Sequence, residues 1–142
     1  MLKNKLIKLV IDTNLWISFI ISNKQNVLDF LLFSKKVRVL FSIELITEIE
    51  TTITKPKLTK YFGSNALEEM LSAFDSFIDL IEVQSIVTVC RDSKDNFLLT
   101  LAKDGNADYL LTGDRHLLEL KKFNKTKIMT ITSFINETKN YR

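Results

Sequence analysis

The sequence predicts an α/β fold with three layers, in which a central, mostly parallel sheet of four or five strands lies between two layers of helices. The first observation is that short apolar runs rich in β-branched residues alternate along the chain with longer segments whose apolar residues recur at helical spacing. The second is that 142 residues suit a single domain, 1–142, while three Gly and one Pro leave no room for a flexible linker.

The expected strands are short apolar runs at 6–11, 37–42, 86–90, 108–112 and 127–132. The first of them contains Leu9, Val10 and Ile11, a composition that predicts a buried strand. Helices are expected at 14–22, 26–36, 43–53, 65–81, 95–105 and 115–120, with a short one at the C-terminus. Ser42 is expected to cap the helix at 43–53, which ends before Pro56.

The segment 65–81 has the clearest helical pattern. Its apolar residues fall on one stripe, namely Leu67, Met70, Leu71, Phe74, Phe77, Ile78 and Ile81. Asn65 and Glu68 have the spacing of a capping box at the start of this helix. Gly105 stands where a C-cap would end the helix at 95–105.

The composition excludes several classes of protein. No apolar run approaches the roughly 20 residues of a membrane-spanning helix, so we expect no association with a membrane. The N-terminus is basic and then apolar, but its apolar run is too short for a signal peptide and lacks a small-residue cleavage site. Cys90 is the only cysteine, which excludes an internal disulfide and fits a reducing compartment. We therefore expect a cytoplasmic protein.

Carboxylates occur where a parallel sheet would bring them together. Asp12 and Asp114 each follow an expected strand, Glu48 lies two turns into the helix after the second strand, and Asp95 begins the helix at 95–105. Ligands bind at the carboxyl ends of the strands in such folds. Taken singly, each acid also has an ordinary explanation: Asp12 or Asp95 at a helix N-terminus, Asp114 in a turn with Gly113, and Glu48 in solvent.

Several carboxylates held together repel one another and raise each other's pKa values, and a hard divalent cation such as Mg²⁺ or Mn²⁺ removes that conflict. Other site chemistries have no support in the sequence. His116 is the only histidine, so a zinc site with several histidines is excluded, and Cys90 has no CxxC partner. No glycine-rich phosphate-binding motif is present.

Four segments together resemble the PIN domain family, a nuclease fold found in many toxins of prokaryotic toxin–antitoxin systems. They are "VIDTN" at 10–14, "SIELITEI" at 42–49, "RDSKDNFLLTLA" at 91–102 and "ADYLLTGDRHLLEL" at 107–120. By motif position, the family's acidic site falls on Asp12, Glu48, Asp95 and Asp114, and its polar helpers fall on Thr112 and Asn14. Glu44, Glu50 and Asp92 lie close to the matched acids as alternatives. Ser93 replaces a proline that is frequent in this branch, which should affect only the loop.

The resemblance implies a metal-dependent endoribonuclease, the toxin of a toxin–antitoxin pair, in which the acids hold one or two Mg²⁺ or Mn²⁺ ions. Single-stranded or looped RNA is the expected substrate, because a recessed site needs a strand that can bend into it. An antitoxin protein is an implied partner. Trp16, Phe19, Phe30 and Phe33 either form an exposed patch suited to a homodimer or belong to the core.

Three other functions share some of these sequence features. A PIN-like module could bind RNA or protein without cutting, although all four acids are present. A phosphohydrolase of the haloacid dehalogenase type needs a second acid two residues after the first, where this chain has Asn14. A phospho-acceptor receiver domain needs an acidic pair at the first strand, which is also missing.

Overall fold

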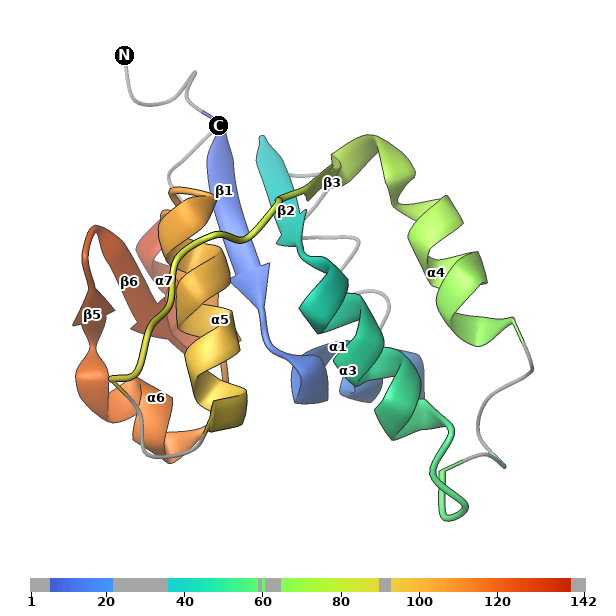
Figure 1. Ribbon diagram of the computed structural model, residues 1–142. Coiled ribbons are helices and arrows are strands. Elements are labelled where there is room, and N and C mark those ends of the chain that lie inside the picture. The colour runs from blue at the N-terminus through green and yellow to red at the C-terminus, as the bar shows by residue number, and fades with distance from the viewer. Residues whose placement is uncertain (1–5, 22–35, 59, 61–64, 90–92, 139–142) are drawn as a thin grey trace.

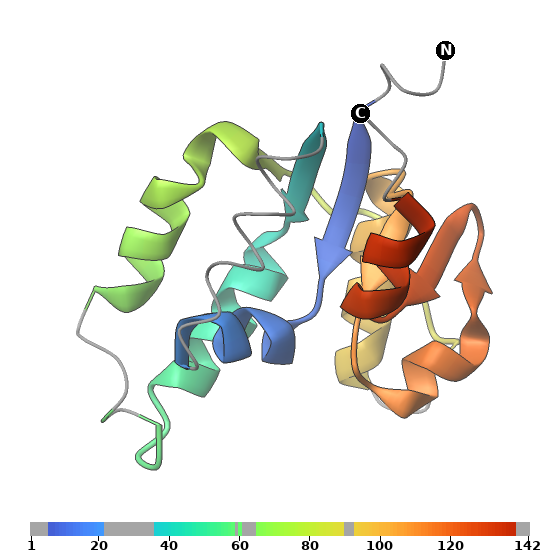
Figure 2. The same cartoon turned by 180° about the vertical axis from the view of Figure 1, so that it is seen from behind.

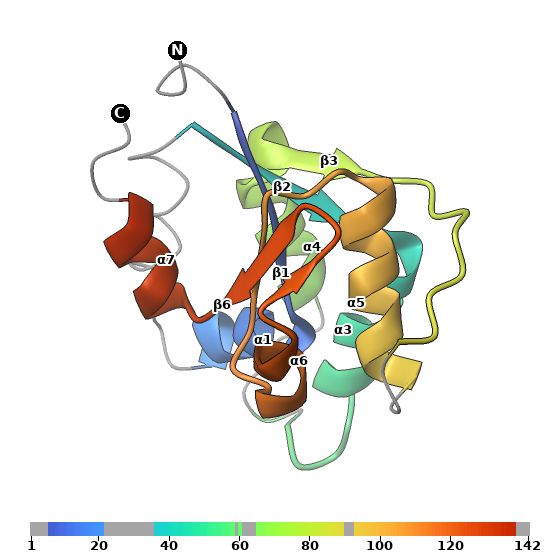
Figure 3. The same ribbon diagram turned by 90° about the vertical axis from the view of Figure 1, so that its left-hand side faces the viewer.

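The computed structural model of the chain describes residues 6–21, 36–58, 60, 65–89 and 93–138. In this part of the chain, six strands form one sheet in the order β3-β2-β1-β4-β6-β5. Helices α3 and α5 lie on one face (Figure 1), and the view from behind shows α1 and α7 on the other side (Figure 2). Figure 3 shows the same separation from the side, with α5 and α7 on opposite sides of the strands. The expected three-layer fold is therefore confirmed, with six strands rather than four or five.

The strands are β1 (Ile7–Ile11), β2 (Val37–Phe41), β3 (Ile78–Leu80), β4 (Tyr109–Leu111), β5 (Lys122–Phe123) and β6 (Thr126–Met129). The helices are α1 (Thr13–Ile21), α3 (Ile43–Ile53), α4 (Ala66–Ala73), α5 (Ser93–Asp104), α6 (Arg115–Leu120) and α7 (Ile131–Thr138). A short 3-10 helix, Asp75–Phe77, precedes β3. No helix in the described ranges is long and apolar enough to cross a membrane.

Strand β1 lies near the middle of the sheet and is parallel to both of its neighbours. Leu9 lies opposite Val39 of β2 and opposite Tyr109 of β4. Strands β3 and β6 continue the parallel arrangement, and only β5 is antiparallel to its neighbour. Val10 and Ile11 are fully buried, as expected for a parallel strand covered on both faces. The carboxyl ends of β1, β2 and β4 therefore meet at one edge of the sheet.

Aromatic side chains of the first helix belong to the core. The Trp16 ring centroid lies 5.1 Å from that of Phe41 and 6.1 Å from that of Phe19. Trp16 and Phe19 are both buried. The alternative that these two residues form an exposed patch is therefore wrong, while Phe30 and Phe33 lie outside the described residues.

The helix predicted after β2 and its cap are confirmed. Ser42 Oγ accepts a hydrogen bond from the Leu45 backbone N–H at 3.1 Å, and α3 ends at Ile53, before Pro56. Most of the helix expected at 26–36 lies outside the described residues, and residue 36 forms a turn directly before β2.

The single helix predicted over 65–81 is wrong in its second half. Helix α4 ends at Ala73, and β3 pairs with β2, with the Ile81 backbone N–H donating to the Phe41 carbonyl at 2.7 Å. Pairing with the edge of the sheet overrides the helical stripe, because tertiary contacts outweigh local preference. The expected capping box also fails, because the Asn65 side chain makes no capping hydrogen bond.

The strand predicted at 86–90 is wrong over 86–89, which has no strand, and Cys90 lies outside the described residues. This segment is tied to the end of α5 instead of to a strand. Asp104 Oδ2 accepts hydrogen bonds from the backbone N–H groups of Gln84, at 2.7 Å, and Ser85, at 2.9 Å. Two of its apolar residues, Ile86 and Val89, are 89% and 55% exposed, whereas Val87 is buried in the core.

Two boundaries near the C-terminus also differ from expectation. The strand predicted at 127–132 ends at Met129, because the Thr130 hydroxyl accepts from the Ser133 N–H at 3.1 Å and helix α7 begins. Gly105 follows α5 as expected, but Asn106 is the residue with positive φ, 54°. Gly105 is needed for another reason, because a Cβ there would lie 2.5 Å from Leu40 Cδ1.

Candidate active site

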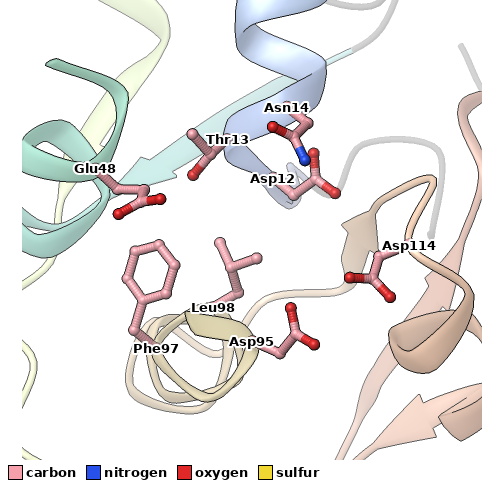
Figure 4. A pocket seen from close by; sticks show the side chains of 8 residues that line it. All are labelled: Asp12, Thr13, Asn14, Glu48, Asp95, Phe97, Leu98 and Asp114. Carbon is pink, nitrogen blue, oxygen red and sulfur yellow. The ribbon is translucent and has the colours of Figure 1, made fainter. Parts of the chain in front are cut away.

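A cavity of about 150 Å³ opens at the carboxyl ends of the central strands, and four acids from four segments line it. They are Asp12 after β1, Glu48 on α3, Asp95 on α5 and Asp114 after β4. The remaining lining residues are Thr13, Asn14, Phe97 and Leu98. Figure 4 shows the Asp12, Asp95 and Asp114 carboxylates on one side of the cavity and Glu48 across from them. We call this cavity the carboxylate pocket.

Asp12 is held in place by hydrogen bonds to both carboxylate oxygens. Oδ1 accepts from the Leu15 backbone N–H at 2.9 Å, which caps α1, and Oδ2 accepts from the Thr112 hydroxyl. The side chain is 5% exposed. Burial raises the pKa of Asp12, and the negative charge of Asp114 adds to this effect, while the hydrogen bonds from Thr112 and Leu15 oppose it.

Asp114 caps the next helix in the same manner. Its Oδ1 accepts from the backbone N–H groups of His116, at 2.7 Å, and Leu117, at 3.4 Å. The Asp114 N–H donates to Thr112 Oγ1 at 3.0 Å, so that Thr112 joins the two acids that follow β1 and β4. The capping explanation is thus correct for Asp12 and Asp114, and it fixes both carboxylates at the pocket. Among the described residues, Asp114 Oδ2 has no hydrogen-bond partner.

The other two acids, Glu48 and Asp95, lie on α3 and α5, which cover the same face of the sheet. Glu48 is half-buried on α3 and lines the pocket, whereas its neighbours Glu44 and Glu50 do not. Asp95 lies in the first turn of α5 and is 8% exposed. Asp92, the alternative to Asp95, lies outside the described residues.

Five of the six site residues expected from the sequence therefore line the pocket. The sixth, Thr112, is hydrogen-bonded to Asp12 and Asp114. Their proximity is observed, and their roles in binding or catalysis stay predictions. Sequence reasoning missed three lining residues, Thr13, Phe97 and Leu98. Thr13 lies in the sequence between two predicted site residues, Asp12 and Asn14, and this position was a signal that could have found it. Phe97 and Leu98 have no such signal, because each resembles any apolar residue on a packed helix.

The side chains that line the pocket offer mainly carboxylate oxygens. Four lining residues are acidic, and among the described lining residues none is basic. Within the same ranges, no three side chains of His, Cys, Asp or Glu approach closely enough to enclose a metal ion. This spacing does not suit a zinc cage, but it fits Mg²⁺ or Mn²⁺, since Mg²⁺ keeps several waters and uses only one or two carboxylates directly.

A polar group in the pocket wall also lacks a partner. The Thr13 hydroxyl is buried and makes no hydrogen bond within the described part of the chain. In Figure 4 its oxygen points toward the space between Glu48 and Leu98. An unpaired buried hydroxyl costs free energy of about 1–3 kcal/mol, so a bound ligand with its water would have a donor available here.

Comparison with known proteins identifies the family to which the chain is similar. The model of the family described as PIN domain matches residues 8–116. The chain is also similar to an uncharacterized protein of Methanocaldococcus jannaschii, at 35% identity over 143 aligned positions that cover 92% of this chain and 91% of that protein.

Proposed function

Because the chain belongs to the PIN domain family, we propose that it is a metal-dependent endoribonuclease that hydrolyses phosphodiester bonds of single-stranded or looped RNA. PIN domains are typically metal-dependent nucleases. The observation that carries the proposal is the carboxylate pocket, where four acids from separate segments meet at the carboxyl edge of a parallel sheet.

The four acids of the carboxylate pocket would be the metal ligands, and two of them are held in fixed positions by the chain. Asp12, Glu48, Asp95 and Asp114 would hold Mg²⁺ or Mn²⁺, which lowers the pKa of a water molecule and offsets negative charge on the phosphodiester. Thr112 keeps Asp12 and Asp114 in a fixed relation through its two hydrogen bonds. Fixed carboxylates lose little conformational freedom when a ligand binds, which is the advantage of a preorganised site.

Other residues at the pocket would position the substrate. Asn14 is exposed at the pocket, so that its amide can donate to phosphate or sugar oxygens of RNA. Arg115 is exposed beside Asp114 and supplies positive charge for the RNA backbone. Without a cation, the acids of the pocket would repel a phosphate, so RNA binding at this place should depend on metal.

The role as toxin of a toxin–antitoxin pair rests on the sequence resemblance. The antitoxin partner rests on the same resemblance. The cytoplasmic location rests on the composition. A homodimer would need a surface other than Trp16 and Phe19, because both residues are buried. A PIN-like module that binds without cutting would show the same pocket, and activity is what separates the two functions.

The experiment compares Asp95→Asn with Asp92→Asn in the initial rate of cleavage of a single-stranded RNA in Mn²⁺. Asp95→Asn should remove nearly all cleavage, because both the charge and the position of a pocket carboxylate change. Asp92→Asn should retain most of it. Circular dichroism confirms that both variants fold. The reverse pattern would mean that the third acid is assigned wrongly, and an inactive wild type in Mn²⁺ and Mg²⁺ would favour the binding module.

A further inference from the structure

A second hollow lies beside the carboxylate pocket, and the two share the side chain of Phe97. Its volume is about 310 Å³, and it lies between the start of α3, the outer side of α5 and the extended segment after β3. We call it the Phe97 groove. Its apolar lining comes from Val83, Ile86, Val87 and Phe97, and its polar lining includes Glu44 and Thr88.

The apolar lining of the groove is exposed at Ile86, whereas Val83 and Phe97 are half-buried and Val87 is buried. Ile86 is 89% exposed. The segment that carries Ile86 is held to the end of α5 by the hydrogen bonds from the Gln84 and Ser85 N–H groups to Asp104. Ile86 is therefore held beside the half-buried Val83 and Phe97, where the groove offers apolar surface to a ligand.

The chemistry of the groove suits a nucleobase rather than a phosphate. Phe97 is half-buried, and Figure 4 shows its ring standing between Glu48 and Leu98 at the edge of the carboxylate pocket. Bases of single-stranded nucleic acids stack on such aromatic rings. Glu44 carries the one charge among the described lining residues, and a carboxylate repels phosphate but accepts hydrogen bonds from the exocyclic amines of bases.

We propose that the Phe97 groove is a nucleobase subsite. It takes the base next to the phosphodiester in the carboxylate pocket, stacks it on Phe97 and prefers bases that can donate an exocyclic amine to Glu44 over uracil. The proposal rests on the proposed function, because the shared wall matters only if a nucleic acid strand enters the carboxylate pocket. The volume lies at the lower end of the range for small-ligand sites, roughly 300–1,000 Å³, and favours one base over a helix of a partner protein.

The first test uses the uncharged nucleosides adenosine, cytidine and uridine, so it needs neither metal nor cleavage. Titration of the wild-type protein, followed by NMR, should shift resonances of Val83, Val87 and Phe97, with uridine binding more weakly than the other two. Ile86→Ser should weaken adenosine binding, and Leu80→Ser is the matched control, because Leu80 is also exposed, at 61%, but does not line the groove.

The second test follows cleavage of oligoribonucleotides in which one abasic position is moved across the scissile bond. One abasic position should raise KM by about tenfold for the wild type, and Phe97→Leu should remove this dependence on position. If Phe97→Leu fails to fold, the comparison of Ile86→Ser with Leu80→Ser carries the test.

The outcomes separate the two proposals. Cleavage of RNA without nucleoside binding or any abasic effect would overturn the subsite and leave the nuclease function standing. Nucleoside shifts in the groove without cleavage would support the subsite and overturn the nuclease function. A groove that binds a basic, apolar peptide but no nucleoside would identify it as a protein-docking surface and contradict the proposal.

Discussion

The carboxylates at the carboxyl ends of the strands differ from those of β3 and the start of β4 in how they are neutralised. The acids of the second group have partners within the chain: Arg38 Nη2 lies 2.5 Å from Asp79 Oδ1 on β3, and Lys125 Nζ lies 3.5 Å from Asp108 Oδ1 directly before β4. The hydrogen bond from Arg38 lowers the pKa of Asp79. At the carboxyl ends, burial raises the pKa of Asp12 and the charge of Asp114 raises it further.

This difference shows where the fold supplies its own counter-charge and where it does not. Asp79 is stabilised in its charged form by the chain itself, whereas the charged form of Asp12 is disfavoured by its surroundings. Functional sites often keep a charge in unfavourable surroundings, at some cost in the stability of the folded protein. The predictions below test whether the two groups of acids respond oppositely to loss of a carboxylate.

The largest effect is expected for Asp12→Asn. Asparagine can still cap α1, but the pocket loses a buried charge, so cleavage in Mn²⁺ should fall by at least about 100-fold, since loss of even an outer partner of a metal ligand costs about 10–100-fold. The melting temperature without metal should stay unchanged or rise. Asp79→Asn is the matched control, with activity kept and melting temperature lowered. If Asp12→Asn melted much lower than Asp79→Asn, the contrast between the two groups of acids would be wrong.

Thr13→Val removes the unpaired hydroxyl while keeping the shape of the side chain. Because the buried hydroxyl has no partner in the described part of the chain, its loss should leave the free energy of unfolding unchanged or raise it by about 1 kcal/mol. The rate of RNA cleavage should fall by about tenfold if a ligand uses this hydroxyl. Chemical denaturation and initial rates provide the two readouts. A variant with wild-type activity would show that Thr13 does not serve the pocket.

Arg38→Met should act only on stability. Arg38 joins β2 to the segment around β3, since it donates to the Ser76 carbonyl at 2.6 Å as well as to Asp79. The side chains of this pair are partly exposed, so a loss of about 1 kcal/mol is expected, or a fall of about 3 °C in melting temperature. A substantial loss of cleavage in the folded variant would contradict the separation of the Arg38–Asp79 pair from the pocket.

The smallest effect is expected for Asp104→Asn, and it depends on pH. The hydrogen bonds of Ser85 and Gln84 lower the pKa of Asp104 below its ordinary value of 3.8. The folded protein therefore binds this proton more weakly than the unfolded chain does. The stability that Asp104 contributes to the folded protein is present above pH 3.8 and is lost as pH falls through the lowered pKa of this residue. Wild type and variant should differ in melting temperature at pH 7 and converge as pH falls through the lowered pKa of Asp104; a constant difference would contradict the assignment.

The sequence predicted the centre of this fold better than its margins. Strands β1, β2 and β4 are continuous apolar runs, and the polar residues that follow β1 and β4, Asp12 and Asp114, could be placed at the pocket from that pattern alone. Strand β3 was missed because Ile78 continues the stripe of a helix, and only pairing with β2 decides its conformation.

The pocket shows the same limit. Asp95 and Glu48 were found through motif position, since helical periodicity does not distinguish them from other acids. Thr13 was missed because the lack of a hydrogen-bond partner is a property of the folded state. Phe97 was missed because an apolar residue on a packed helix carries no sign that it faces two hollows.

The most direct test of the account is the melting temperature of the wild type, Asp12→Asn and Asp79→Asn with and without millimolar Mn²⁺. A cation that binds only the folded protein stabilises it by about 2.7 kcal/mol at 100 times its dissociation constant. The account predicts a rise of several degrees for the wild type and Asp79→Asn, and little or none for Asp12→Asn. No rise in the wild type, or an equal rise in all three proteins, would contradict a cation site in the carboxylate pocket.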